Sequence, residues 1–559
     1  MKKTNLLLTI ALQLLIFQAF SGPGIINSGG RIVSSGTGSY WVVSGGNFTL
    51  TSQSVDNLAS MNNLTIASGA SLTIDSQSFL TVTGAVTNSN STGTVGLTIN
   101  SDATSTASLI TPSATGTGAA ATQRWMSSGA WHLVSAPVVQ TVSNFLTANA
   151  NIPTNSSSYR GMMDYNPGTN QWNTFFTDGT SNGSIGSGKG FSERVGASDA
   201  AVTATGLLQA GAMSVAAAEG LWDCIGNPYS SAIGITTLSN ATANFLTVND
   251  ANFDPSYGAI YVWTKVDIYN GTTGNYTPVS NVPTPTDGYD NLSQGQAFMV
   301  KRKTTGGADF SFTTAMQLHS GALALKSSQS PWPTIKLVAS ANAQSASTLI
   351  AFNDGMTKGL DRTYDAGLLR GGSDVQLYTR LVEAGGNTIP FAIQALPDQN
   401  FNEMIIPVGV ESKIGGDVVF SSETTNLPSN CKVILEDKLT KSFTDLSANV
   451  YKAAIMPNST VADRFQLHTS TATIGAIGQS ILSGKLNAYA IGNTGIRVVG
   501  EVSGKAVAAL YDVLGKAVLM QKLSEGTLNV IPLSNIKPGV YILSVEDKGI
   551  TNFKLRIIN

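Results

Sequence analysis

Residues 64–82 read LTIASGASLTIDSQSFLTV, and a three-residue phrase recurs in them every eight positions. The phrases are Leu64-Thr65-Ile66, Leu72-Thr73-Ile74 and Leu80-Thr81-Val82, and Leu97-Thr98-Ile99 follows them. Side chains alternate along a strand, so the apolar ends of each phrase are expected to face a core and the Thr to face outward. Gly and Ser between the phrases supply bends. Short strands at a fixed period favour a stacked β-solenoid, with an antiparallel meander as the alternative.

The composition of the whole chain restricts its class. Of the 559 residues, 42% are hydrophobic and only 12% are charged. Disordered chains combine low hydrophobicity with high net charge, so this chain is expected to fold, and its length suggests several domains. A net charge of −2 argues against a nucleic-acid partner, which needs clustered Lys and Arg. Long stretches lack the Glu, Lys, Leu and Ala mixture of helices, which favours an all-β fold.

The few cysteines and histidines predict neither a metal site nor a cofactor. Two cysteines far apart in the sequence, Cys224 and Cys431, exclude a disulfide scaffold and a Cys-rich zinc module. We expect two separate buried thiols in place of a disulfide. The three histidines, His132, His319 and His468, fit no metal-binding spacing.

The first 21 residues have the pattern of a secretory signal peptide. Lys2 and Lys3 precede a mostly apolar run at residues 6–17, and small residues around Ser21 provide a cleavage site. The run is too short to span a bilayer comfortably, so a membrane anchor is the weaker alternative. The mature chain is expected to begin near Gly22, to lack a transmembrane span and to work outside the cytoplasm.

Residues 22–118 form the predicted solenoid, and residues 119–320 contain an apparent internal duplication. Three motifs recur in the same order: a Trp-led strand, an aromatic–turn–aromatic hairpin, and a Gly-x-x-Phe segment. Chance is the alternative for motifs this short, but the shared order favours two copies of one β-rich module. Superposition is expected to align Trp131 with Trp222 and Phe191 with Phe298. The hairpin motifs are residues 165–172 and 269–276, which would match Tyr165 with Tyr269 and Trp172 with Tyr276.

Three further segments follow the duplication. Residues 321–468 have strand patterns at 335–338, 349–352 and 433–435 and are predicted to form a β-sandwich. Residues 469–484 lack charge and are rich in Ser, Thr and Gly, which is typical of a linker. The final unit, residues 485–559, has nine Lys/Arg and five Asp/Glu, whereas residues 22–484 have 21 and 29.

Six or seven short strands are expected in the final unit, which predicts a small immunoglobulin-like β-sandwich. The expected strands are 496–499, 506–511, 517–520, 529–533, 540–545 and 553–558. Between two of them, Asp512 and Gly515 stand at the ends of a type I turn, and Pro538-Gly539 supplies a second turn.

This final unit resembles a known family. Residues 507–518 (VAALYDVLGKAV), residues 531–545 (IPLSNIKPGVYILSV) and then Phe553-Lys554-Leu555 are similar to the type A C-terminal sorting domain of the Bacteroidetes type IX secretion system. In that family a YDxxG strand-turn, a PGxY turn-strand and a final Lys-containing strand recur in this order at the C-terminus. The resemblance covers about 75 residues of the chain.

The resemblance implies an export route and a set of recognition residues. The chain would reach the periplasm, cross the outer membrane through the type IX machinery, and lose this domain when it is released or attached to surface lipopolysaccharide. For each recognition residue the alternative is that it only shapes the fold of the domain, and we favour this alternative for Gly515 and Gly539. The Tyr541 ring is expected to pack in the sandwich and Lys554 to point outward. The residues carried over are Asp512, Gly515, Pro538, Gly539, Tyr541 and Lys554.

Other local patterns do not assign a site. Residues 183–190 imitate a phosphate loop, but Gly190 stands where Ser or Thr is needed, so a turn before a strand is the better interpretation. Residues 250–254 start like an EF-hand, but Pro255 replaces the required Gly, which favours an Asx-rich turn, with a lone surface calcium site as the alternative. Any of the seven tryptophans could stack on a sugar, although core packing is the commoner role of Trp. No catalytic residue is assigned.

These observations favour a multidomain, secreted or cell-surface protein without enzymatic activity, acting as an adhesin or a structural envelope component. Its expected partners are the type IX machinery and surface lipopolysaccharide or extracellular polysaccharide. The alternative is a secreted carbohydrate-active enzyme or carbohydrate-binding cargo. A concave pocket with two or more buried carboxylates or a metal cluster would favour the enzyme.

Overall fold

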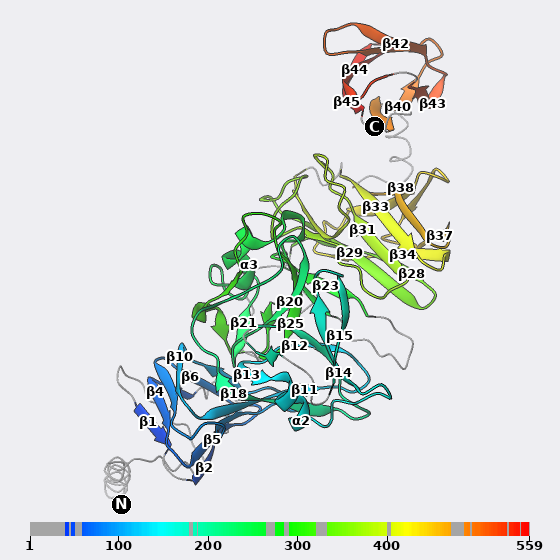
Figure 1. Ribbon diagram of the computed structural model, residues 1–559. Coiled ribbons are helices and arrows are strands. Elements are labelled where there is room, and N and C mark those ends of the chain that lie inside the picture. The colour runs from blue at the N-terminus through cyan, green and yellow to red at the C-terminus, as the bar shows by residue number, and fades with distance from the viewer. Residues whose placement is uncertain are drawn as a thin grey trace, which may run out of the picture.

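The computed structural model describes residues 40–43, 46–50, 59–177, 183–186, 188–263, 274–283, 290–319, 332–399, 404–470, 486–491, 495–533, 536–547 and 549–557. The regular elements of the described chain are almost all strands, which confirms the all-β class. In Figure 1 its units follow one another along an elongated molecule, from the N-terminal strands in blue to the C-terminal domain in red. The predicted signal peptide at residues 1–21 lies outside the described residues.

The N-terminal strands stack in three parallel sheets. The sheet orders are β1-β4-β7-β10, β2-β5-β8 and β3-β6-β9, so each turn of the chain contributes one strand to each sheet. The pairing is parallel throughout, as a solenoid requires and a meander excludes. The strands are β1 (Tyr40–Val43), β2 (Gly46–Leu50), β3 (Ala59–Met61), β4 (Asn63–Ile66), β5 (Ala70–Ile74), β6 (Phe79–Val82), β7 (Ala85–Asn88), β8 (Val95–Ile99), β9 (Ser108–Ile110) and β10 (Ser113–Gly116).

The eight-residue repeat corresponds to the sides of one turn of this solenoid. The phrases that begin at Leu64, Leu72 and Leu80 lie on β4, β5 and β6, in three different sheets. The stacking partner of Leu72 is Leu97, on the following turn. The apolar ends of the phrases are buried and each Thr is partly exposed, as expected. Each strand therefore gains its core only by stacking on the next turn.

The solenoid sheet continues past residue 118. Strand β11 (Ala119–Met126) pairs in parallel with β8, and then antiparallel with β18 (Ala200–Leu208). One seven-stranded sheet therefore joins the solenoid to the first module, in the order β16-β13-β18-β11-β8-β5-β2. A sequence boundary drawn from a loss of repeat phrases does not detect such shared pairing.

The two modules have the same strand order. The first has the sheet β12-β17-β14-β15 and the second the sheet β20-β25-β22-β23. Val134 pairs with Phe191, and Ile225 pairs with Phe298, which places Trp131 in register with Trp222. The strands are β12 (His132–Val134), β14 (Tyr159–Asn166), β15 (Gln171–Thr177), β17 (Phe191–Glu193), β20 (Trp222–Gly226), β22 (Ile260–Trp263), β23 (Tyr276–Val279) and β25 (Ala297–Lys301).

Two short helices carry a further duplicated motif that the sequence analysis missed. The sequence Asn-Phe-Leu-Thr occurs at residues 144–147, within α2 (Val142–Ala148), and at residues 244–247, where Asn244 caps α3 (Phe245–Val248). Asn149 then bonds both backbone groups of Thr203, and Asn249 bonds both backbone groups of Ser311, at 2.7–2.9 Å. Each buried Asn ties its helix to the strand that closes its module.

Smaller strands and 3₁₀ turns complete the modules. They are β13 (Val138–Thr141), β16 (Ser184–Ile185), β19 (Met213–Val215), β21 (Ala232–Gly234), β24 (Asn291–Leu292), β26 (Phe310–Phe312), β27 (Gln317–Leu318), η2 (Asp250–Asn252), η3 (Pro255–Tyr257) and η4 (Thr314–Met316).

Cys224 and Cys431 are both buried and unpaired, which confirms the expectation of two separate thiols.

The predicted sandwich is a single sheet that folds over its own core. Its order is β36-β35-β38-β33-β31-β32-β29-β28-β34-β37, with β30 on β32. The rings of Phe420 on β34 and Phe465 on β38 lie 4.9 Å apart although their strands are distant in this order, so the two ends of the sheet face each other. The strands are β28 (Thr334–Ala341), β29 (Gln344–Phe352), β30 (Ala366–Gly367), β31 (Val375–Thr379), β32 (Phe391–Leu396), β33 (Ile405–Ser412), β34 (Gly416–Thr425), β35 (Lys432–Asp437), β36 (Ser442–Asp445), β37 (Tyr451–Ile455) and β38 (Ser459–Ser470).

The last strand of this sheet corrects the predicted linker boundary. Thr469 and Ser470 pair with β35 at the end of β38, so the strand extends two residues into the segment predicted as linker. Uncharged Ser and Thr residues suit a strand as well as a loop, which is why composition alone misplaced the boundary. The rest of that segment, up to residue 484, lies outside the described residues.

The C-terminal domain has two small sheets around a separate core. They are β39-β40-β43 and β42-β41-β44-β45, and within the described ranges neither includes a strand from the earlier units. The strands are β39 (Asn487–Ile491), β40 (Gly495–Val502), β41 (Val507–Tyr511), β42 (Ala517–Lys522), β43 (Gly526–Pro532), β44 (Gly539–Glu546) and β45 (Ile550–Ile557). All six predicted strands are present, and β39 is the one that the sequence analysis missed.

Candidate functional site

The hairpins of the two modules present equivalent aromatic pairs. Tyr165 on β14 pairs across the hairpin with Trp172 on β15, and Trp263 on β22 pairs with Tyr276 on β23. The ring centroids are 5.1 Å apart in the first pair and 4.9 Å apart in the second, with an interplanar angle of 64° in both. Such edge-to-face contacts between opposite residues stabilise a hairpin and fix the rings in place.

This pairing corrects the residue matching expected from the sequence. Met163 and Tyr261 occupy equivalent positions beside β17 and β25, so Tyr165 corresponds to Trp263 and Trp172 to Tyr276. Tyr269, the expected counterpart of Tyr165, lies outside the described residues. The error arose because both hairpin motifs begin and end with aromatic residues, and spacing alone does not show which aromatic residues lie on strands.

A cleft of about 370 Å³ lies over these four rings. The two pairs are joined directly, because Trp172 Nε1 donates a hydrogen bond of 2.9 Å to the Tyr276 hydroxyl. One wall comes from the sandwich, where the Gly371 amide donates to Asn275 Oδ1 at 3.0 Å. The remaining lining residues are Asn170, Gln171, Met299, Leu369, Arg370 and Gly372.

The charge of the cleft is balanced within it. The Arg370 guanidinium, a lining group, makes a bidentate pair with Glu411 at 2.6 and 2.8 Å. Hydrogen bonding to Glu411 raises the pKa of Arg370 above its ordinary value. Because the arginine charge is matched by its partner and its plane is held, the cleft offers rigid donors without a net charge.

Two aromatic residues of the cleft, Tyr276 and Trp263, differ in whether their polar group can serve a ligand. Burial raises the pKa of Tyr276 to about 12, so its hydroxyl stays protonated at neutral pH and can donate while it accepts from Trp172. The Nε1 of Trp263 is buried and has no hydrogen-bond partner in the described part of the chain. Because this nitrogen has essentially no exposed surface, it is closed to a ligand in the cleft, and its unpaired state costs about 1–3 kcal/mol.

Apolar ring faces bordered by a few fixed polar groups suit one ligand class best. The faces of aromatic rings carry partial negative charge and attract the C–H groups of a sugar ring. Sugar hydroxyls can then pair with the amides of Asn170 and Gln171, which line the same cleft.

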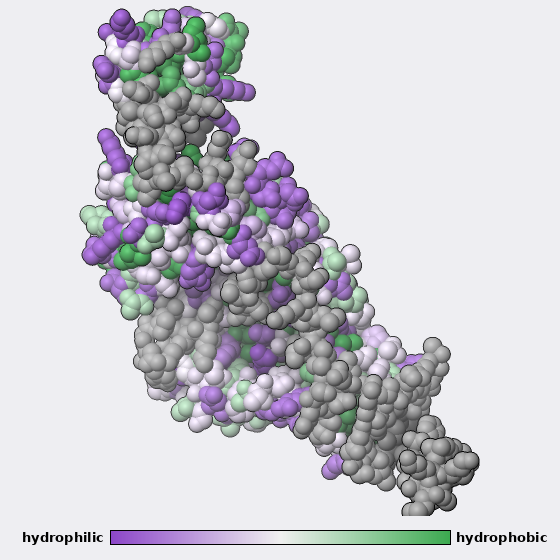
Figure 2. Space-filling model, turned by 180° about the vertical axis from the view of Figure 1, so that it is seen from behind, coloured by the Kyte–Doolittle hydropathy of each residue, from purple (hydrophilic) through white to green (hydrophobic). Residues whose placement is uncertain are grey.

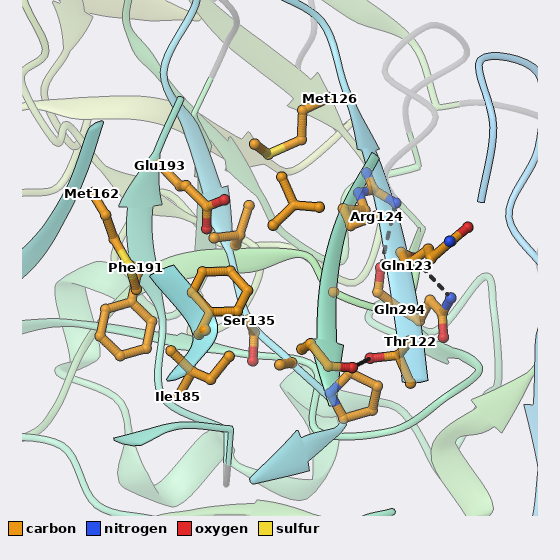
Figure 3. Close-up of a pocket in the computed structure, with 17 residues that line it drawn as sticks. Thr122, Gln123, Arg124, Met126, Ser135, Met162, Ile185, Phe191, Glu193 and Gln294 are labelled. Atoms are coloured by element: carbon orange, nitrogen blue, oxygen red, sulfur yellow. Dashed lines mark hydrogen bonds between the residues drawn. The ribbon is translucent and has the colours of Figure 1, made fainter. Parts of the chain in front are cut away.

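A second, smaller cavity lies where the two modules meet. Its volume is about 30 Å³, enough for one or two waters. Figure 3 shows the carboxyl group of Glu193 pointing into this cavity, with Phe191 and Met162 nearby. The Oε1 of Glu193 is buried without a hydrogen-bond partner in the described residues. Burial raises its pKa to about 8, against the opposing influence of Arg160.

Stability is therefore expected to depend on pH through Glu193. Its folded-state pKa lies above the ordinary 4.5, so the folded chain holds this proton at pH values where the unfolded chain has lost it. The resulting stability is complete below about pH 4.5 and is lost as the pH rises toward 8. Glu193→Gln should remove this loss of stability. The difference in unfolding free energy between the variant and the wild type should therefore shift in favour of the variant by roughly 3 kcal/mol between pH 5 and pH 8.

Chemical denaturation of the full chain at several pH values measures this difference. Glu423→Gln is the control, because Glu423 is an exposed surface carboxylate paired with Lys336. Parallel pH profiles for wild type and Glu193→Gln would contradict the assignment.

The predicted sorting residues gather at one end of the sheet β42-β41-β44-β45. Gly539 pairs with Ile557, and Lys554 pairs with Ile542, which also pairs with Tyr511 just before the turn at residues 512–515. Asp512 accepts hydrogen bonds from the amides of Leu514 and Lys516 at 2.9 and 3.0 Å, which closes that turn. The antiparallel register brings together positions 42 residues apart, from Asp512 to Lys554.

Side-chain directions in this domain agree with expectation. Lys554 is exposed between the partly buried Phe553 and the buried Leu555. The Tyr541 ring packs against the domain core, and its hydroxyl donates to the Lys537 carbonyl at 2.8 Å. Pro538 precedes β44 directly, where its fixed φ leads the chain into the strand.

Gly515 and Gly539 have different backbone requirements. Gly515 has a φ of +79°, whereas Gly539 is not in the left-handed region. Gly515→Val should therefore destabilise the domain by about 1–2 kcal/mol, and Gly539→Val should cost less. Limited proteolysis of the C-terminal domain in the full chain measures this, with Gly549→Ala as the control. Equal effects of the two valine variants would contradict the difference in backbone conformation.

The patterns that imitate ligand sites are turns and ion pairs. Lys189, the phosphate-loop candidate, makes an ion pair with Asp164 at 2.5 Å. In the EF-hand candidate, Asp250 pairs with Arg362 at 3.3 Å and Asp254 with Lys301 at 3.3 Å. No group of three or more His, Cys, Asp or Glu side chains able to hold a metal occurs among the described residues. Within the same residues, no helix has the length and apolar character needed to cross a bilayer.

Comparison with known proteins gives two family matches. The family described as "Domain of unknown function (DUF8693)" matches residues 40–468, and the secretion system C-terminal sorting domain matches residues 495–559. No curated protein matches the chain. Among solved structures, one titled "Biofilm associated protein - BSP domain" matches with 13% identity and a TM-score of 0.13. That match covers 26% of this chain and 27% of the other, about a quarter of its length.

Proposed function

The chain belongs to the family described as domain of unknown function DUF8693, and on this premise we propose that it is a non-enzymatic adhesin that binds a neutral carbohydrate chain. Its C-terminal sorting domain makes it a cargo of type IX secretion and directs it to the cell surface or the extracellular space. The ligand is the expected polysaccharide partner, and surface lipopolysaccharide is a second candidate source of the same chemistry.

One observation carries the proposal: equivalent aromatic pairs from two copies of a module line a single cleft. Protein interiors are closely packed, so core packing alone does not explain why 370 Å³ stays open beside four aromatic rings. The pairs also lie on equivalent strands, so a sugar chain would meet similar surfaces on successive residues.

The proposal assigns binding without turnover. The described lining of the cleft contains no carboxylate, and the nearby Glu411 is held by Arg370. Hydrolysis of a glycosidic bond usually needs a pair of carboxyl groups on either side of the bond. Binding by aromatic stacking requires only the rings and a few hydrogen bonds.

Affinity electrophoresis of the mature protein in gels that contain single soluble polysaccharides tests the proposal. Neutral polysaccharides should retard the protein, and the same sugars should show no shortening after long incubation. Purified lipopolysaccharide in a parallel gel tests the second source. Chain shortening would establish an enzyme instead, and unchanged migration in all gels would contradict the binding function.

A further inference from the structure

The C-terminal domain exposes large apolar side chains at the end of the sheet where the predicted sorting residues gather. Val513 and Leu514, in the turn between β41 and β42, are 73% and 90% exposed. Val540 and Ile542, on β44, are 38% and 45% exposed. Figure 2 shows hydrophobic residues on the surface of this domain, at the top of the view. We call these four residues, together with Lys554 and Arg556, the tip patch.

The register of the strands places four members of the patch on one outward face. Ile542 pairs with Lys554, and Val540 pairs with Arg556. The alternate residues Leu543 and Leu555 point the other way, into the core, where they are at most 4% exposed. The outward direction of the patch therefore follows from the alternation of side chains along β44 and β45.

The turn itself does not need apolar side chains. Its backbone is closed by the Asp512 carboxylate and by the hydrogen bond from the Gly515 amide to the Asp512 carbonyl, at 3.0 Å. Any small polar residue would serve at positions 513 and 514, and such turns normally carry polar residues. Exposing two neighbouring apolar side chains to water is unfavourable unless a partner covers them.

The charges at the patch indicate the character of that partner. Lys554 and Arg556 are exposed, and neither forms an ion pair within the described part of the chain. The whole unit from residue 485 carries nine Lys/Arg against five Asp/Glu. Two cations beside an apolar centre complement a hydrophobic pocket with acidic residues at its rim.

We propose that the tip patch is the surface through which the sorting domain docks on a component of the type IX machinery, in an apolar pocket with an acidic rim. Val513 and Leu514 enter the pocket, and Lys554 and Arg556 pair with its rim. This inference rests on the sorting-domain match and not on the carbohydrate cleft, so either can fail without the other.

The test uses the full chain in its secreting cell. Val513→Ser/Leu514→Ser should lower the fraction of protein at the surface or in the medium at least fivefold, with the uncleaved chain accumulating in the periplasm. Lys554→Glu/Arg556→Glu should do the same. Ile550→Ser is the matched control, because Ile550 is 67% exposed on the same sheet but pairs with Glu546 at its other end.

Two further measurements keep the result unambiguous. Protease resistance of the purified full-length variants checks folding, and both substituted turn residues are exposed enough that it should be unchanged. Size-exclusion chromatography of the wild type tests whether a second copy covers the patch. Normal export of Val513→Ser/Leu514→Ser would overturn the proposal, and so would a wild-type dimer that this variant converts to a monomer.

Discussion

A chain that ends at residue 484 is expected to remain in the periplasm as an intact, folded passenger. The sorting domain matches residues 495–559, and its two sheets include no strand from the earlier units among the residues that the structure describes. Its core is likewise a separate cluster. Removing the domain therefore deletes the export signal and leaves the hydrophobic cores of the other units intact. The fraction of protein displayed at the surface should fall to background.

Cell fractionation with detection of the passenger measures this effect. The truncated chain should be as protease-resistant as the same region of the full-length protein, which excludes degradation as the cause. As a complementary control, residues 485–559 fused to an unrelated protein with a signal peptide should bring that protein to the surface. Efficient display of the chain ending at 484 would show that the address lies elsewhere.

Trp172→Ala is expected to weaken carbohydrate binding by about 30-fold. Trp172 contributes a ring to the cleft, pairs edge-to-face with Tyr165 and donates a hydrogen bond to Tyr276. Its removal deletes one stacking surface and frees the rings that face it. Loss of a central aromatic contact typically costs about 2 kcal/mol, which corresponds to the stated change in affinity.

The matched control lies on the same hairpin. Tyr159 and Phe175 also form an aromatic pair, with ring centroids 5.2 Å apart, but both are 42% exposed and neither lines the cleft. Phe175→Ala should therefore leave retardation in a polysaccharide gel unchanged. Tyr276→Phe separates the ring from its hydroxyl and should cost less than Trp172→Ala. Equal binding by wild type and Trp172→Ala would exclude the cleft as the site.

Local sequence signals were sufficient for most individual strands and turns. The Leu-Thr-Ile phrases predicted strands because alternation marks a buried side, and β4, β5 and β6 carry them. The Asp512–Gly515 turn and the outward direction of Lys554 followed from turn chemistry and alternation. These properties depend on neighbours within a few residues, so a single sequence contains the necessary information.

The sequence by itself thus determined the all-β class, the duplication and the sorting domain, while long-range pairing decided the rest. Thr469 and Ser470 look like linker until β35 pairs with them. The bond between Trp172 and Tyr276 joins residues 104 positions apart, and the tip patch exists only because β41, β44 and β45 align in one register. Contacts of this kind depend on which strands meet, and that choice is made by the packing of whole sheets, which no local pattern records.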